Sequence, residues 1–167
     1  MPRNNDSALI LFYRGFADYY RKNWSRAASH FDRAFELRPT LLPARLGKAL
    51  SEAIGQRKPE ALEILSETKS KIEEREVRDS EAIYKVAQAY AVLGEKAPAL
   101  RVLRQSIENG FFSYPYLAAD PLLDALRAEP ECTQLLALAR QRHEAFKKLL
   151  FLTIRTRIAR FSAEPRL

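Results

Sequence analysis

The chain has 167 residues, of which 47% are hydrophobic and 29% are charged, a balance typical of a folded globular domain and not of a disordered chain. Five glycines among abundant Ala, Leu, Arg and Glu favour helices, and a single cysteine excludes an internal disulfide. The net charge is +7, and residues 140–167 carry eight Lys or Arg against two Glu, so a basic segment follows a nearly neutral body.

Nothing in the sequence predicts a membrane span or a secretory leader. A spanning helix needs about 18 or more mainly apolar residues, and no such stretch occurs. The first residues, Met1 to Asp6, are mostly polar and lead into a helical pattern without the apolar core of a signal peptide. Together with the single cysteine, this pattern predicts a cytoplasmic protein.

Apolar spacing, capping residues, prolines and glycines divide the chain into helices. Asp79 is a typical N-cap, Pro59 and Pro98 suit a first helical turn, and Gly55 suits a helix end. After a disordered N-terminus at residues 1–7, the predicted helices cover about residues 8–21, 24–37, 42–54, 59–78, 81–93 and, with Pro98 in its first turn, a segment ending at 109.

Beyond these helices the sequence predicts an aromatic loop, a short helix and a long basic helix. Residues 111–116 hold Pro115 among aromatic side chains and are predicted to be non-helical. Asp120 before a proline predicts a cap and a seventh helix over about residues 121–128. An eighth helix is predicted to begin at Pro130 and to continue to about residue 160.

Three alanines, each four residues before a large apolar residue, recur along the chain. Ala61 lies 34 residues after Ala27, and Ala99 lies 38 residues after Ala61. A period near 34 is typical of stacked helix pairs, and the longer second spacing predicts about one extra turn in the charged stretch 69–78. The three combinations are Ala27 with Phe31, Ala61 with Leu65, and Ala99 with Leu103.

Two of these three units resemble the tetratricopeptide repeat (TPR) family. In that family small residues let paired helices cross closely, large residues fill the gap between them, and a proline ends the unit. The second unit fits at Ala49 but departs at Thr68 and Glu73. The pattern is carried by Gly15, Trp24, Ala27, Phe31, Ala34 and Pro39 in the first unit and by Ala87, Tyr90, Gly94, Ala99 and Leu103 in the third.

The resemblance implies an all-α fold, a right-handed TPR-type superhelix of antiparallel helix pairs with a C-terminal helical cap. The cap resembles the segment that closes TPR arrays in some bacterial regulatory proteins, and a solenoid needs such an element to cover its last apolar face. The implied parts are a domain over 8–146 with repeats 8–41, 42–79 and 80–113 and a cap 114–146, followed by a basic amphipathic helix and tail over 147–167.

The sequence offers no catalytic or metal-binding pattern. Neither His30 nor His143 stands at metal-ligand spacing. The glycines are scattered and form no phosphate-binding loop, and no order of Ser, His and acidic residues indicates a nucleophile with its base. We therefore expect a protein that is not an enzyme and that takes no metal, cofactor or small-molecule substrate.

The TPR resemblance implies a binding groove, because the first helix of each pair lines the concave face in that family. Aromatic side chains with a few polar neighbours suit an interface, so we expect a non-catalytic interaction module that binds a peptide or helix of another protein. Alternatively, helix packing or the C-terminal helix covers the same side chains. The groove residues at helical spacing are Phe12, Phe16, Tyr19, Tyr20, Leu46, Leu50, Tyr84, Lys85 and Gln88.

The C-terminal helix supports a second hypothesis, because it combines an apolar stripe with basic residues. Such a helix predicts self-association into a homodimer, or binding to an anionic membrane surface or nucleic acid, unless it folds back on the body. Leu149, Phe151 and Leu152 lie off the stripe, which favours burial from several sides over a membrane surface. The stripe is Phe146, Leu150, Ile154, Ile158 and Phe161, and the basic residues are Lys147, Lys148, Arg155, Arg157 and Arg160.

Overall fold

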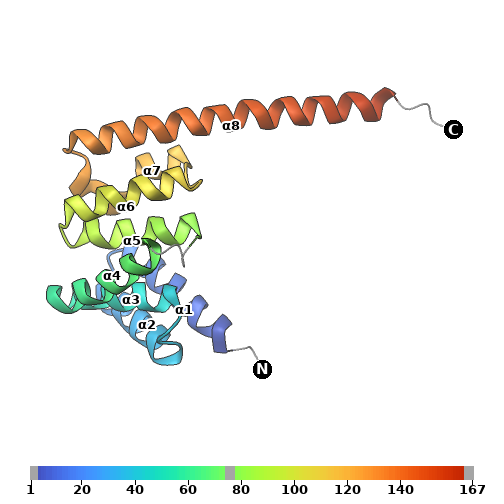
Figure 1. Cartoon of the computed structure of the whole chain (residues 1–167). Coiled ribbons are helices and arrows are strands. Elements are labelled where there is room, and N and C mark those ends of the chain that lie inside the picture. The colour runs from blue at the N-terminus through green and yellow to red at the C-terminus, as the bar shows by residue number, and fades with distance from the viewer. Residues whose placement is uncertain (1–3, 74–77, 164–167) are drawn as a thin grey trace.

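The computed structural model describes the backbone of residues 4–73 and 78–163 and the side chains of residues 7–70 and 78–154. Throughout these ranges the regular structure is helical, which confirms the all-α prediction. Figure 1 shows a stack of helices from which one long helix projects. In chain order the elements are α1 (Asn4–Tyr20), α2 (Trp24–Leu37), α3 (Leu42–Ile54), α4 (Lys58–Glu73), α5 (Ser80–Val92), α6 (Lys96–Glu108), α7 (Tyr114–Ala119), the 3-10 helix η1 (Pro121–Leu126) and α8 (Pro130–Ala163).

Consecutive helices pack in pairs, α1 with α2, α3 with α4, and α5 with α6. Neighbouring pairs meet through α1, α3 and α5, and α2 also packs on α3. The recurring alanines and the large residues four positions after them are all fully buried between these helices. The sequence period therefore reports the close crossing of helix pairs.

Helix boundaries follow the local signals in most of the chain. The bounds of α2 and α3 are those predicted from sequence. The carboxylate of Asp79 caps α5, accepting hydrogen bonds from the backbone N–H groups of Glu81 at 2.9 Å and Ala82 at 3.3 Å. Helix α4 has 16 residues where α3 and α5 have 13, which agrees with an added turn; the predicted continuation over 74–77 lies outside the described residues.

The N-terminal prediction is wrong in part, because α1 already begins at Asn4 and residues 4–7 are helical. Residues 1–3 of the predicted disordered segment lie outside the described residues. Ala8 is fully buried, so α1 is packed against the body from this residue onward.

The predicted loop and seventh helix also differ from the structure. Within residues 111–116 a short helix, α7, begins at Tyr114, because Pro115 occupies a first-turn position where no N–H donor is required. The segment predicted as an α-helix over 121–128 is instead the six-residue 3-10 helix η1. Short connecting helices commonly adopt this tighter geometry.

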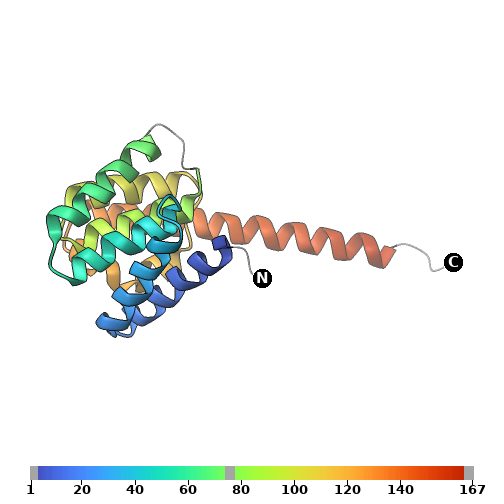
Figure 2. The same ribbon diagram turned by 90° about the horizontal axis from the view of Figure 1, so that it is seen from below.

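The long helix α8 begins at Pro130, as predicted, and packs across α6 and α7 before it leaves the body. Figures 1 and 2 both show its C-terminal part standing clear of the other helices. Within the described ranges, none of the helices has both the length and the apolar character needed to cross a membrane.

The first two helix pairs are held together by the ring of Phe31, which lies between two glycines. A Cβ atom added to Gly15 of α1 would lie 2.5 Å from this ring, and one added to Gly47 of α3 would lie 2.8 Å from it. Because neither glycine has a side chain, α1, α2 and α3 approach closely enough to enclose a fully buried phenyl ring.

We expect Gly15→Ala to destabilise the fold by up to about 2 kcal/mol, measured by urea unfolding. Overpacking a core costs about 1–3 kcal/mol, and the better helix propensity of alanine returns about 1 kcal/mol. The matched control is Gly55→Ala, whose new Cβ would meet the flexible guanidinium of Arg57 and should leave stability unchanged or slightly higher. Equal effects of the two substitutions would contradict this account of the close crossing.

Candidate functional site

The predicted aromatic groove is not an open surface in the structure. Of its nine residues, eight are at most 8% exposed, and Tyr20 alone among them is 37% exposed. The buried eight are Phe12, Phe16, Tyr19, Leu46, Leu50, Tyr84, Lys85 and Gln88. A peptide or helix therefore cannot reach these side chains in the folded chain, and the alternative of burial by packing describes them correctly.

Two kinds of contact bury these residues. The rings of Phe12 and Phe16 pack on Phe31, with centroids 6.1 and 6.0 Å apart. The ammonium group of Lys85 lies 4.8 Å from the centroid of Phe16 and 3.2 Å from the carboxylate of Glu81, so this lysine is enclosed as one member of an ion pair. The remaining polar members, Tyr84 and Gln88, face a carboxylate that sequence reasoning did not connect to them.

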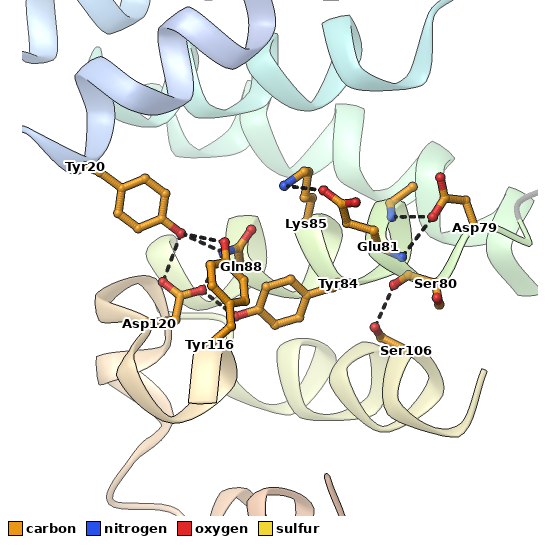
Figure 3. A network of polar contacts seen from close by, with 11 residues as sticks. Tyr20, Asp79, Ser80, Glu81, Tyr84, Lys85, Gln88, Ser106, Tyr116 and Asp120 are labelled. Carbon is orange, nitrogen blue, oxygen red and sulfur yellow. Dashed lines mark hydrogen bonds and ion pairs between the residues drawn. The ribbon is translucent and has the colours of Figure 1, made fainter. Parts of the chain in front are cut away.

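That carboxylate belongs to Asp120, which lies between α7 and η1 and is 2% exposed. Its Oδ1 accepts from the hydroxyl of Tyr20 at 3.1 Å and from the backbone N–H of Leu122 at 2.9 Å. Its Oδ2 accepts from the hydroxyl of Tyr84 and from Nε2 of Gln88. Figure 3 shows these side chains converging from α1, α5 and the start of η1. We call Tyr20, Tyr84, Gln88 and Asp120 the Asp120 cluster.

The electrostatics of the Asp120 cluster suit a role in holding neighbouring helices together. Burial raises the pKa of Tyr84, and the neighbouring carboxylate raises it further, so the phenol remains a proton donor. Burial likewise raises the pKa of Tyr20 above its ordinary value. The Nε2 of Gln88 donates to Tyr20 as well, at 3.0 Å, while its buried Oε1 has no hydrogen-bond partner. The cluster thus satisfies a buried carboxylate with donors from three elements.

One part of this cluster was visible in the sequence. Asp120 before Pro121 predicted a helix cap, and the hydrogen bond from the Leu122 N–H confirms it. The convergence of Tyr20 and Tyr84 on the same carboxylate had no local signal, because these residues are 100 and 36 positions away from it along the chain.

A second buried carboxylate, Asp18, joins α1 to α2. A hydrogen bond from Asn23, 3.3 Å long, lowers the pKa of Asp18, and the nearby Arg26 and His30 lower it further. His30 Nδ1 lies 3.2 Å from Oδ2 of Asp18 without the alignment of a hydrogen bond. Among the hydrogen bonds and ion pairs of the described residues, this pair has Asn23 and Arg26 as its further partners.

The single cysteine is enclosed in the packing of the helices. Cys132 is 1% exposed, and burial raises the pKa of its thiol, which disfavours the reactive thiolate. Across the residues with described side chains, no three His, Cys, Asp or Glu residues are grouped so that they could hold a metal ion.

Two shallow clefts flank Trp24 on the edge where helix ends meet. A cleft of about 350 Å³ runs between Trp24 and η1, and a second of about 530 Å³ runs towards Ile54 and Leu93. The indole packs edge-on against Tyr19, with centroids 5.0 Å apart, and remains 44% exposed. Burial raises the pKa of Tyr19 to about 12, so its hydroxyl stays neutral at the floor of both clefts.

Among the side chains that the structure describes, the most exposed large apolar ones lie on α8. Arg142 Nη1 donates to the carbonyl groups of Ile107 at 2.8 Å and Glu108 at 3.1 Å, which ties α8 to the end of α6. Phe146 meets Phe112 edge-on at 6.1 Å. After this contact five large apolar side chains are each between 44% and 65% exposed, namely Leu149, Leu150, Phe151, Leu152 and Ile154. We call residues 149–154 the apolar belt.

The predicted basic and apolar residues of the C-terminal helix fall into two groups. Lys147, Lys148 and Ile154 lie on the projecting part of α8 and are exposed, so this helix does not fold back on the body. The other residues belong to α8, but their side chains lie outside the described residues; they are Arg155, Arg157, Ile158, Arg160 and Phe161.

Comparison with known proteins finds a match to the model of one protein family. The model of a family described as "A/B hydrolase-like, N-terminal domain" matches residues 44–147. Among curated proteins and solved structures, no significant match to the chain is found.

This match corrects the tetratricopeptide resemblance, which is wrong, and the likeness of residues 114–146 to a TPR closing segment loses its basis with it. The alternation of small and large residues reports closely crossing helix pairs. Helical folds of different families share that packing requirement, so the pattern identified the helix pairs and not the family.

We expect Tyr84→Phe to lower the free energy of unfolding by about 1.5–3 kcal/mol, because it removes a donor to a buried carboxylate. The folded-state pKa of Tyr84 is raised above 10.0, so wild-type stability is complete below that value and is lost as the pH rises beyond it. Urea unfolding from neutral to alkaline pH should show a steeper loss for wild type than for the variant. Tyr13→Phe, at a half-exposed residue, is the control and should change little.

We expect Asp18→Asn to destabilise the chain at neutral pH and to have a smaller effect in acid. The folded pKa of Asp18 lies below 3.8, so its contribution is present above that value and is lost as the pH falls through the lowered pKa. Thermal melts at several pH values measure the difference, with Asp124→Asn at an exposed carboxylate as control. A difference that does not shrink in acid would contradict the assigned role.

Proposed function

The chain belongs to the family described as A/B hydrolase-like, N-terminal domain, and on that premise we propose that it is a non-catalytic helical module that binds a catalytic domain of the α/β-hydrolase type. An α/β-hydrolase nucleophile stands on a turn at the top of a parallel sheet. The described residues form helices alone, so the catalytic sheet would be supplied by the partner domain.

The apolar belt is the observation that carries this proposal. The family match ends at residue 147, where α8 leaves the body, and the belt begins two residues later. Exposed large apolar side chains on a protruding helix are costly in water and mark an interaction site. The groove predicted from sequence is buried, which leaves the belt as the stronger candidate for the contact with a partner.

Two further features support a module without chemistry of its own. The thiol of Cys132 is buried, and His30 lies beside the carboxylate of Asp18, so each of these two side chains lies within the packing of the helices. We also propose a cytoplasmic location, supported by the unpaired cysteine.

The test is direct binding of the full chain to an α/β-hydrolase-fold protein. Tagged chain is used to capture proteins from its own cells, and hydrolase-fold proteins identified by mass spectrometry are purified and titrated calorimetrically. We expect Phe151→Asp to weaken binding by roughly tenfold or more, because a buried Phe contributes about 1.5–3 kcal/mol and about 1.4 kcal/mol is a factor of ten.

The matched control is Ile10→Asp, which places the same charge on an exposed apolar residue of α1, at the other end of the stack in Figure 1. It should bind as wild type does, and both variants should keep their melting temperatures because both sites are exposed. The proposal fails if no hydrolase-fold protein binds the purified chain, if Phe151→Asp binds normally, or if the chain alone hydrolyses p-nitrophenyl esters.

A further inference from the structure

The apolar belt is apolar around the whole circumference of α8. Successive residues of an α-helix are rotated by about 100°, so six consecutive residues face every direction. Leu149, Phe151 and Leu152 are each more than 60% exposed. The one polar residue, Thr153, donates its hydroxyl to the carbonyl oxygen of Leu149 at 2.9 Å, so that hydroxyl is already paired within the helix.

Positive charge stands at both ends of the belt. Lys147 and Lys148 precede it, Arg155 and Arg157 follow it, and the sequence contains no acidic residue from 145 to 163. The nearest carboxylate before the belt is that of Glu144, 3.4 Å from the ammonium group of Lys147. A surface that covers the belt therefore meets cations on either side of it.

A second copy of this chain is a poor partner for the belt. Two belts paired antiparallel with Leu149 opposite Ile154 place Lys148 opposite the position of Arg155 at both ends. Two belts paired parallel and in register place each lysine beside its own copy. Like charges at facing positions destabilise helix pairs, and they are poorly screened over distances below the Debye length of about 8 Å at physiological salt.

A lipid surface fits the belt less well than a protein groove. A helix that lies in a membrane interface keeps one polar face in water, and the belt has no such face. Six residues span about 9 Å along the helix axis, which is far less than the roughly 30 Å of a hydrocarbon core.

We propose that the partner surface is an apolar protein groove that encloses the belt on several sides and carries carboxylates at both of its ends. This rests on the proposed function, since it describes the surface by which the hydrolase-type domain takes up α8. The apolar walls bury the belt, and the carboxylates pair with Lys147 and Lys148 at one end and with the arginines at the other.

The first experiment tests the charge argument without any partner, by sedimentation equilibrium of the full chain. We expect wild type to be monomeric at micromolar concentration. The charge-reversed variant Lys147→Glu with Lys148→Glu should self-associate at least roughly tenfold more tightly, because the antiparallel pair then has opposite charges at both ends. The charge-neutral variant Lys147→Gln with Lys148→Gln should fall between them. A wild-type dimer at micromolar concentration, or no gain in the reversed variant, would overturn the proposal.

The second experiment uses a defined probe, a labelled helical peptide of about four heptads with Leu at positions a and d and Glu at e and g. This peptide presents an apolar stripe edged with carboxylates. Fluorescence anisotropy should show binding to wild type that weakens several-fold in about 1 M salt, where the Debye length falls to about 3 Å. The same peptide with Lys in place of Glu, and the Phe151→Asp chain with the Glu peptide, should not bind.

The outcomes separate this inference from the function on which it rests. If the Glu peptide binds and no hydrolase-fold protein does, the apolar partner surface with carboxylates is supported. The proposed binding to a hydrolase-type domain is contradicted. If a hydrolase-fold protein binds independently of salt and the Glu peptide does not bind, the proposed groove with carboxylates is contradicted. The proposed binding to a hydrolase-type domain is then still supported. Co-sedimentation with phosphatidylglycerol vesicles but not with the Glu peptide would overturn the groove in favour of a lipid surface.

Discussion

The buried carboxylate of Asp120 is the joint on which the arrangement of the structure depends. It receives hydrogen bonds from Tyr20 of α1, from Tyr84 and Gln88 of α5, and from the backbone at the start of η1. A buried charge is tolerated only where donors replace its hydration, so the loss of any one of these donors would leave a buried carboxylate incompletely paired. The first helix pair, the third pair and the closing segment are thereby fixed relative to one another.

Helix α8 packs on the elements next to this carboxylate, α6 and α7. Asp120 orders η1, α8 begins a few residues later at Pro130, and Arg142 then anchors it to the carbonyl groups at the end of α6. The C-terminal part of this helix stands clear of the stack (Figure 1). Beyond Phe146 it carries the exposed Lys147 and Lys148 and then the exposed large side chains of the apolar belt. A folded body that presents an exposed apolar helix is suited to binding, because the helix is already folded before a partner covers it.

Sequence reasoning predicted the local elements well and the surfaces poorly. Asp79, Pro59 and Pro130 mark helix starts through their own backbone chemistry, so α4, α5 and α8 begin at or within a residue of the predicted positions. The groove prediction failed because Phe12, Tyr84 and Gln88 have helical spacing that suits an exposed face and a buried face equally. Which face is covered depends on Phe31 and Asp120, and neither contact has a signature in the local sequence. The family assignment failed for a related reason, since close helix crossing is a packing requirement of many families.

The sequence by itself determined the helices, their pairing, and the uneven charge that places basic residues around the end of α8, because propensity, capping and periodicity act over a few residues. Only the tertiary structure decided that the aromatic face is core, that Asp120 collects donors from distant helices, and that α8 projects instead of folding back. These outcomes depend on contacts between residues up to 100 positions apart, whose free energy appears only when the helices are brought together. The apolar belt depends on both the sequence and the tertiary structure. The sequence determines its apolar composition, and the fold determines that it is exposed.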